Sequence, residues 1–329
     1  MTIGQVLMWA REILKQADSV SPVLDAEILL SEVLNKPHPN PFVQSATGGF
    51  SLKERGSIDR AFLYAHPEKK ITNNQELKYK KMIRQRVKGE PVAYILGYKE
   101  FYGLKFLVNK EVLVPRPETE LMVDNVVSEC QSVKVSECQD CLIIDVGVGS
   151  GCIPITLIKR FKIYNLRFKI LAIDISDKTL AVAKNNAKLH NVDKKIKFIK
   201  SDLLENISKS LFLNHKSIIL TANLPYLSES IYKKNYQNLK FEPSRALLAG
   251  KDGLKYYRRL LKQIKELISK KQDTISKFKS VVIFLEIGPE QKLGISKLIK
   301  KYLPLAKIEF KKDLSGQNRL IMIKYKQHL

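Results

Sequence analysis

The stretch of the sequence with the clearest chemical potential is a polar turn, Asn223-Leu224-Pro225-Tyr226, which follows an apolar run at 218–220. The Asn223 side-chain oxygen and the Leu224 carbonyl are two acceptors that can hold both N–H groups of a planar amino group. Pro225 restricts Leu224 to extended conformations and so fixes where that carbonyl points. Tyr226 offers a flat face for the planar group. The same four residues also suit an ordinary loop, so the rest of the sequence must decide.

An amino nitrogen held in this way can attack an electrophilic methyl group in line. Its lone pair is delocalised in an amide or an aromatic amine, and acceptors on its N–H groups favour the transition state in which it becomes positive. Catalysis is then mostly placement at roughly 3–3.5 Å with aligned orbitals. No general base is obligatory, because the proton can leave after the transfer. We therefore expect Asn223, Pro225 and Tyr226 to be catalytic, and these three and Leu224 to bind the substrate.

A second motif, DVGVGSG, begins at Asp145 and has the form of a cofactor-binding loop. An apolar strand leads into Gly147, Gly149 and Gly151, and a helix follows, which is the context that such a motif requires. The spacing is G-x-G-x-G, and Cys152 stands where the dinucleotide pattern has its third glycine. Asp145 suits the ammonium group of a ligand and would repel a pyrophosphate. The loop therefore favours S-adenosyl-L-methionine over NAD, and the alternative is a glycine turn without a ligand.

Acidic residues also follow the next two predicted strands. Asp174 ends the second strand, where an acidic residue typically binds ribose hydroxyls. Asp202 follows the third strand, where it could accept from an adenine amino group while Leu203 packs on the ring; alternatively, Asp202 caps a helix. The expected cofactor site consists of Asp145, Gly147, Val148, Gly149, Ser150, Gly151, Asp174, Asp202, Leu203 and Asn223.

Three regions of the chain differ in pattern. Residues 1–88 contain short amphipathic helices without strands, which predicts a helical bundle. Residues 89–120 mix β-branched and aromatic residues with glycines and predict a β-hairpin linker. Residues 121–329 alternate strands with helices, which is typical of a doubly wound α/β sheet with ligands at the carboxyl ends of its strands. The last of these strand-like runs lie at 308–326 and predict an antiparallel hairpin.

Five segments in this order give the sequence a specific resemblance: RQRVKGEPVAYILGYKEFYGLKF, VPRPETE, DVGVGSG, NLPY and FEPSRALLAGKDGLKYYR. Together they resemble the peptide-chain-release-factor glutamine N5-methyltransferases of the HemK/PrmC type, over about residues 1–326. The resemblance implies a helical substrate-recognition domain, a hairpin linker and a methyltransferase domain that uses S-adenosyl-L-methionine. It also implies methylation of the glutamine side chain in the Gly-Gly-Gln loop of peptide chain release factors 1 and 2. Phe101 would then wall the substrate pocket.

The sequence departs from this family at Leu224, where the usual motif reads Asn-Pro-Pro-Tyr. The carbonyl is kept but the turn loses one fixed φ, so we expect activity with looser positioning. Segments 204–217 and 269–280 are longer and more polar than the family needs, and we expect surface loops there. Arg116 and Glu120 in VPRPETE either line the mouth of the active site or lock the linker. FEPSRAL either covers the pocket or simply joins a loop to a helix.

Composition sets the remaining expectations. The 57 lysines and arginines against 33 acidic residues give a net charge of +24, which could mark a nucleic-acid or ribosome-associated surface. However, lysines outnumber arginines 45 to 12, which favours compositional drift because phosphate-reading surfaces more often use arginine forks. The single C-x-x-C pair has no partner ligands for zinc, so we expect no metal. We also expect a cytoplasmic protein without membrane contact, because neither a long apolar run nor a signal peptide is present.

Three other functions fit parts of this pattern. A nucleic-acid N-methyltransferase could hold an exocyclic amine in the same clamp, but a base-flipping enzyme usually carries a large recognition domain, for which little chain remains. We therefore do not expect direct nucleic-acid binding. A ribosomal-protein glutamine methyltransferase would apply the same chemistry to another protein. A non-enzymatic adaptor predicts a broken glycine loop or a lost Asn223, and the sequence keeps both.

Overall fold

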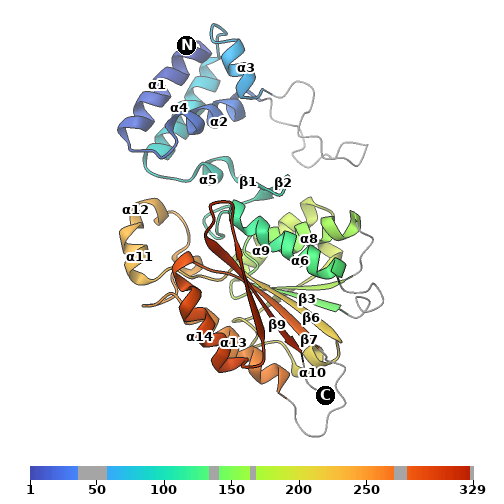
Figure 1. The fold of residues 1–329 in the computed structure, drawn as a ribbon. Coiled ribbons are helices and arrows are strands. Elements are labelled where there is room, and N and C mark those ends of the chain that lie inside the picture. Colours follow the sequence, from blue (N-terminus) through green and yellow to red (C-terminus); the bar gives the residue numbers. More distant parts are fainter. Residues whose placement is uncertain (36–57, 133–140, 164–167, 270–279, 327–329) are drawn as a thin grey trace. The chain divides into compact units, whose positions relative to one another are not determined.

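The protein is seen in a computed structural model that describes residues 1–35, 58–132, 141–163, 168–269 and 280–326. It consists of two compact units, Met1–Tyr98 and Lys99–Leu329 (Figure 1). The first unit has one hydrophobic core, and the second has one on each face of its sheet. The division into a recognition domain at 1–88, a linker at 89–120 and a catalytic domain at 121–329 stays a prediction.

Among the described residues up to 96, the first unit consists of helices, with a single isolated β-bridge between Thr2 and Lys70. Thr2 and Thr72 each begin a helix with a capping box, which satisfies N–H groups that the first turn leaves free. The apolar helix faces meet in a core in which Tyr79 donates its hydroxyl to the carbonyl of Ala26 at 3.0 Å. The predicted helical bundle is therefore confirmed. Its helices are α1 (Ile3–Gln16), α2 (Pro22–Leu34), α3 (Arg60–Ala65), α4 (Asn73–Val87) and α5 (Val92–Leu96).

The predicted hairpin linker is correct only in part. Val92–Leu96 forms the short helix α5 instead of a strand, and Gly97 ends it with a φ of 81°, which favours glycine. The hairpin itself follows as β1 (Tyr98–Phe101) and β2 (Leu104–Leu107). A short apolar run of aromatic and β-branched residues does not distinguish a helix from a strand, so the sequence pattern placed the first strand too early.

A seven-stranded sheet forms the centre of the second unit, with the strand order β5-β4-β3-β6-β7-β9-β8. The first five are parallel, and β9 and β8 form the predicted antiparallel hairpin. The order reverses at β3, whose neighbours are β4 and β6, and in doubly wound sheets ligands bind beside such a switch point. The strands are β3 (Cys141–Val146), β4 (Lys169–Asp174), β5 (Ile196–Lys200), β6 (Ser217–Ala222), β7 (Ser280–Glu286), β8 (Lys307–Lys312) and β9 (Asn318–Lys326).

Helices cover both faces of this sheet (Figure 1). Side chains alternate along each strand, so Ile143 packs with one helical layer and Ile144 with the other. The predicted doubly wound, Rossmann-like α/β fold is confirmed. One layer contains α6 (Glu120–Ser132), α8 (Cys152–Ile163) and α9 (Asp177–Leu189), and the other contains α10 (Lys209–Leu213), α13 (Lys255–Ile268) and α14 (Lys292–Tyr302). Two short helices follow β6, α11 (Glu229–Lys234) and α12 (Tyr236–Leu239).

The segment 204–217 is not the surface loop that its polarity predicts. Leu204, Ile207 and Phe212 are buried in the core, and α10 packs against α13. The three apolar side chains are spaced widely among polar ones, which hides them from a reading of composition. The other segment expected to be a loop, 269–280, lies almost wholly outside the described residues. Within the ranges that the structure describes, no helix is long and apolar enough to cross a membrane.

Candidate active site

A cavity of about 750 Å³ lies at the carboxyl ends of the parallel strands, within the roughly 300–1,000 Å³ typical of ligand pockets. The structure brings eight of the predicted site residues to its wall: Gly147, Gly149, Asp174, Asp202, Leu203, Asn223, Leu224 and Pro225. The predicted glycine loop, ribose residue and substrate clamp therefore border one space. Their roles in binding stay predictions.

The glycine loop is shaped by backbone that other residues rarely adopt. Gly147, Gly149 and Gly151 have φ values of 78°, 55° and 84°. A Cβ at Gly147 would lie 3.1 Å from the Leu224 side chain, and one at Gly151 would lie 3.0 Å from Ile155. Glycine is thus required at Gly147, which faces the Asn223–Tyr226 clamp, and at Gly151, which faces the helix that follows the loop.

Two further carboxylates, Asp174 and Asp202, line the cavity beside the glycine loop. Asp174 accepts from the backbone N–H groups of Gly149 at 3.3 Å and Ser176 at 3.0 Å, so it ties the end of β4 to the glycine loop. Burial raises its pKa. Asp202 accepts from Arg259 at 2.8 Å instead of capping a helix. Leu203, beside it, is held at a φ of 55°.

Asp145 itself lies behind the cavity wall, 1% exposed at the end of β3. One of its carboxylate oxygens accepts from the Thr221 hydroxyl at 2.7 Å. The other is buried without a hydrogen-bond partner among the described residues. A buried, unpaired acceptor is costly, and a ligand ammonium group would satisfy it. The residues present therefore fit S-adenosyl-L-methionine, with its amino acid moiety held near Asp145 and the glycine loop. Val148, Ser150 and Gly151 do not line the cavity.

The clamp follows directly from the pairing of the strands. Parallel pairing of β3 with β6 places Val146 beside Ala222, so the glycine loop and the Asn223 turn leave neighbouring strands side by side. The Leu224 side chain, 3% exposed, packs toward Gly147 and joins the core. Leucine at the position of the family's first proline therefore contributes apolar contact in place of a fixed φ.

Tyr226 is the clamp residue that does not line the cavity. Its ring packs against the core, and burial raises its pKa well above that of a free tyrosine. Its carbonyl accepts from the Gln291 side-chain amide at 2.9 Å, and the same nitrogen donates to the Gly253 carbonyl at 2.9 Å. A Cβ on Gly253 would lie only 2.3 Å from the Tyr226 carbonyl oxygen. The glycine in the KDGLKYYR segment thus allows the backbone to approach the clamp.

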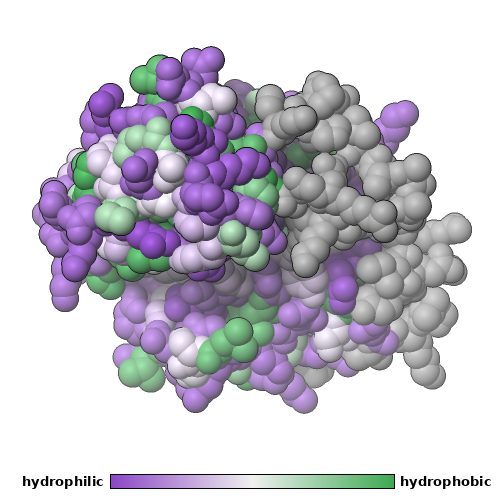
Figure 2. Space-filling model, turned by 90° about the horizontal axis from the view of Figure 1, so that it is seen from above, coloured by the Kyte–Doolittle hydropathy of each residue, from purple (hydrophilic) through white to green (hydrophobic). Residues whose placement is uncertain are grey.

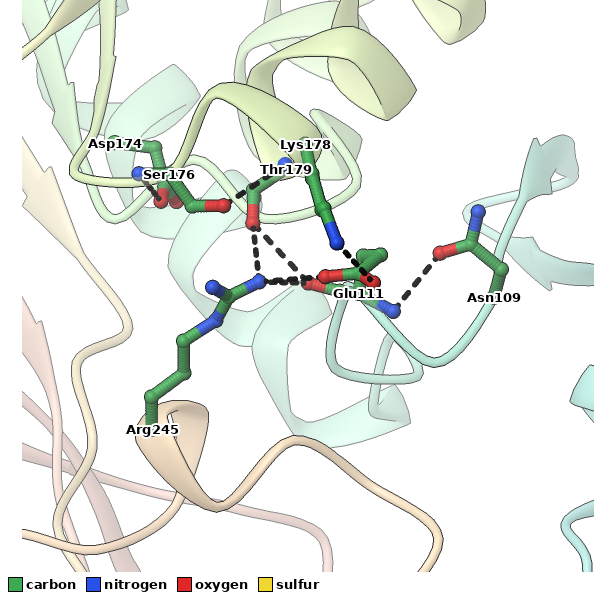
Figure 3. A network of polar contacts seen from close by, with 7 residues as sticks. All are labelled: Asn109, Glu111, Asp174, Ser176, Lys178, Thr179 and Arg245. Atoms are coloured by element: carbon green, nitrogen blue, oxygen red, sulfur yellow. Dashed lines mark hydrogen bonds and ion pairs between the residues drawn. The ribbon is translucent and has the colours of Figure 1, made fainter.

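Two ion pairs join the FEPSRAL segment to residues 111–116. Arg245 donates to the Glu111 carboxylate at 3.0 Å, and both residues line the cavity (Figure 3). Figure 3 also shows Thr179 and Lys178 beside them at the start of α9. The second pair joins Arg116 to the buried Glu242. FEPSRAL therefore borders the cavity, and Arg116 holds it to the preceding segment.

Phe101 is placed differently from the expectation. It is 2% exposed and packs edge-on against Phe106 in the core, away from the residues that line the cavity. It is therefore not a wall of this pocket.

Glu120 accepts from the backbone N–H of Tyr102 at 2.7 Å, so it holds the hairpin turn. No cluster of possible metal ligands occurs in the part of the chain that the structure describes. Cys138 of the C-x-x-C pair lies outside the described residues.

The sequence analysis missed two buried polar residues beside the clamp, Thr119 and Glu286. Asn223 donates from its side-chain nitrogen to the Thr119 hydroxyl at 3.1 Å, and Thr119 donates to the Glu286 carboxylate at 2.6 Å. Both lie at least 63 residues from Asn223 in the chain, so local spacing gave no sign of them. The one available signal was an acidic residue at the end of the apolar run 281–287, next to the strand of the clamp.

Comparison with known proteins agrees with this geometry. A family model described as the PrmC N-terminal domain matches residues 51–97, and one described as RNA cap guanine-N2 methyltransferase matches residues 140–246. A release factor glutamine methyltransferase from Bacillus subtilis is 36% identical over 265 residues, which cover 80% of this chain and 85% of that protein. One from Clostridium botulinum is 31% identical over 98% of both proteins.

Among solved structures, the catalytic domain of hMettl16 in complex with a MAT2A hairpin matches 78% of this chain and 82% of that chain, with a TM-score of 0.50 and 14% identity. This likeness shows the fold alone. The sheet, the glycine loop and the matched methyltransferase model define the protein as an S-adenosylmethionine-dependent methyltransferase. At a finer level, its relatives show that the chain belongs to the release factor glutamine methyltransferase family.

Proposed function

We propose that this protein methylates the side-chain amide nitrogen of the glutamine in the Gly-Gly-Gln loop of class-1 peptide chain release factors. The observation that carries the proposal is that Asn223, Leu224 and Pro225 line the same cavity as the glycine loop and Asp174, in a chain of this family. An amide acceptor pair beside a cofactor site is the arrangement that methyl transfer to a planar nitrogen needs. We further propose that the reaction takes place in the cytoplasm, on release factors 1 and 2.

The residues in and around the cavity have separate roles in binding the cofactor and the substrate. Asp145 and the backbone of Gly147 and Gly149 would hold the amino acid moiety of the cofactor, Asp174 would take the ribose, and Asp202 and Leu203 would border the adenine. When bound, S-adenosyl-L-methionine would supply the methyl group and become S-adenosylhomocysteine. Asn223 Oδ1 and the Leu224 carbonyl accept from the two N–H groups of the glutamine amide, which aims its lone pair into the cavity. The amide nitrogen gains the methyl group and afterwards loses one proton to water.

We assign recognition of the protein substrate to the N-terminal helical unit. In support, the matched family model for residues 51–97 is specific to this enzyme type by its description. The glutamine loop must enter a cavity formed within the second unit, so a separate helical unit is free to bind surface outside that loop.

The test is transfer of labelled methyl groups from S-adenosyl-L-methionine to a panel of substrates. The panel contains a purified release factor, the same factor with its loop glutamine changed to alanine, ribosomal protein, RNA and duplex DNA. We expect label on the intact release factor only, and none with the Asn223→Ala enzyme. Label on ribosomal protein alone would contradict the substrate and keep the chemistry.

A nucleic-acid amine is the second candidate, because the model that matches residues 140–246 is described as an RNA cap guanine-N2 methyltransferase. An exocyclic amino group of guanine is planar and has two N–H groups, so it fits the same acceptor pair. Label on RNA or DNA in the panel, lost with Asn223→Ala, would favour this candidate over the release factor.

A further inference from the structure

Glu286 is a buried acidic residue whose position the fold alone does not explain. It ends β7 and is 2% exposed. Pairing of β6 with β7 places Ala222 beside Leu285, so Asn223 and Glu286 follow at the same edge of the sheet. Arg319 contributes charge nearby, but its ion pair is with Asp313 at 3.1 Å. An isolated buried carboxylate is costly, which points to a use for it.

The hydrogen bonds around this carboxylate have a fixed direction. An ionised carboxylate only accepts, and a threonine hydroxyl has a single proton to donate. Thr119 gives its proton to Glu286 at 2.6 Å, so its oxygen can only accept from Asn223. An acceptor oxygen at this position requires the nitrogen side of the Asn223 amide to face Thr119.

This direction decides what Asn223 can offer to a substrate. With its nitrogen held by Thr119, the amide leaves Oδ1 for the cavity that Asn223 lines. If the amide were flipped, it would present N–H donors toward the N–H groups of the incoming glutamine. That arrangement would repel the substrate amide instead of orienting it.

We propose that Glu286, through Thr119, is a positioning residue that keeps the acceptor face of the Asn223 amide toward the substrate. The inference rests on the proposed function, because it assumes that Asn223 binds the amino group that receives the methyl. It assigns a role to Thr119 of the VPRPETE segment, which otherwise only ends the short 3-10 helix before α6.

The direction of the hydrogen bonds from Asn223 through Thr119 to Glu286 depends on the charge of Glu286. Burial is the largest influence and raises its pKa to about 7, opposed by the hydrogen bond from Thr119, by Arg319 and by Asn223, while Glu118 raises it. The Tyr257 hydroxyl donates to the backbone carbonyl of Glu286. Below this pKa the protonated carboxyl can donate to the Thr119 hydroxyl. Thr119 can then donate to Asn223, which reverses the direction of both hydrogen bonds. We therefore expect kcat to rise with pH through about 7.

The experiment measures kcat, KM and their pH profiles on whichever substrate the wild-type protein labels. Glu286→Gln no longer fixes the direction, and we expect kcat to fall roughly tenfold, as for misplacement of a reacting group, with a flat profile near pH 7. Thr119→Val should also lose roughly tenfold, and Thr119→Ser should keep kcat within about threefold because it retains the hydroxyl. The Kd for S-adenosylhomocysteine should not change in any of them.

A second readout does not require activity. In spectra of ¹⁵N-labelled protein, the Asn223 side-chain amide protons are identified by their loss in Asn223→Ala. We expect them to exchange slowly in the wild type and faster in Thr119→Val and Glu286→Gln. Glu286→Gln should melt no lower than the wild type at pH 8, because a carboxyl with a raised folded-state pKa is destabilising when ionised.

The outcomes separate this inference from the proposed function. A wild-type enzyme that does not label the release factor overturns the function, whereas the kinetics on the labelled substrate and the amide exchange still test the positioning role. An enzyme that requires Asn223, but whose kcat, pH profile and amide exchange are unchanged in Glu286→Gln and Thr119→Val, overturns the positioning role alone. If Thr119→Val does not fold, Glu286→Gln and Thr119→Ser decide.

Discussion

At the scale of residues, buried carboxylates distinguish this site from an ordinary crevice. Asp174 and Glu286 end parallel strands and Asp145 is the last residue but one of β3, and burial raises the pKa of each. The first two were evident from the sequence, because they adjoin the glycine loop and the next strand end. Glu286 was not, because its partners Thr119 and Asn223 come together only when the sheet forms.

Asp145 should make cofactor binding depend on pH. Burial, and to a smaller extent Asp174, raises its pKa to about 7, against the hydrogen bond from Thr221. Only the ionised form attracts an ammonium group, so affinity should be high above pH 7 and fall below it. We expect the Kd for S-adenosylhomocysteine, measured by calorimetry, to rise by up to tenfold per pH unit between 6.5 and 5.5, the limit for one titrating group.

The matched variants are Asp145→Asn and, away from the cavity, Asp193→Asn. Asp145→Asn should bind weakly at pH 7.5 and show little further loss at pH 5.5, whereas Asp193→Asn should follow the wild type. If the Kd of Asp145→Asn for S-adenosylhomocysteine still depends on pH as in the wild type, the titrating group is Asp174 instead.

At the scale of elements, strands were predicted better than connections. Four of the five parallel strands are continuous apolar runs because they are buried on both faces, and the edge strand β5 (IKFIK) alternates instead. The buried side chains around α10 were missed because their burial depends on the distant helix α13, and α5 was missed because its packing partners are α2 and α4. The strand ends that carry the site could therefore be located from sequence, while the segments that border the cavity could not.

The turn at Gly253 should be required for the clamp. In Gly253→Ala the new Cβ would meet the Tyr226 carbonyl at 2.3 Å and the Gln291 amide at 2.7 Å, so the clamp backbone must shift. Gly316→Ala is the matched control, because φ is 79° there against 72° at Gly253, and a Cβ would meet nothing within 4 Å.

Both of these variants should lose about 1–2 kcal/mol of unfolding free energy from the positive φ. Only Gly253→Ala should lose kcat, by more than about tenfold, because the reacting group is displaced. Denaturant unfolding and methyl-transfer kinetics measure the two effects. Equal kcat values in the two variants would show that the turn does not position the clamp.

The Arg245–Glu111 pair should slow release of the cofactor. Arg245 is 46% exposed at its side chain and Glu111 25%, so the pair should add little to stability. It nevertheless joins two segments that border the cavity. Arg245→Gln should raise the cofactor off-rate and Kd by about three- to tenfold, a loss of roughly 1 kcal/mol, with Tm almost unchanged.

Lys80→Gln is the control, because it breaks the Lys80–Glu76 pair on α4 and removes the same charge. Its off-rate should equal that of the wild type in stopped-flow measurements. An Arg245→Gln protein with wild-type kinetics would mean that the segments stay in place without the ion pair.

At the scale of the whole molecule, the net charge of +24 should produce weak binding to nucleic acid without turnover. Among the coloured residues in Figure 2, hydrophilic ones predominate, with apolar groups between them. Of the 57 basic residues, 45 are lysines. Counterion release makes such binding fall steeply with salt. We expect binding to duplex DNA in filter assays at 50 mM salt to weaken at least tenfold at 200 mM. Methyl transfer to the release factor should change less than threefold, because the clamp selects its amide through short-range hydrogen bonds. Saturable, salt-resistant labelling of DNA or RNA would instead assign the charge to a nucleic-acid substrate.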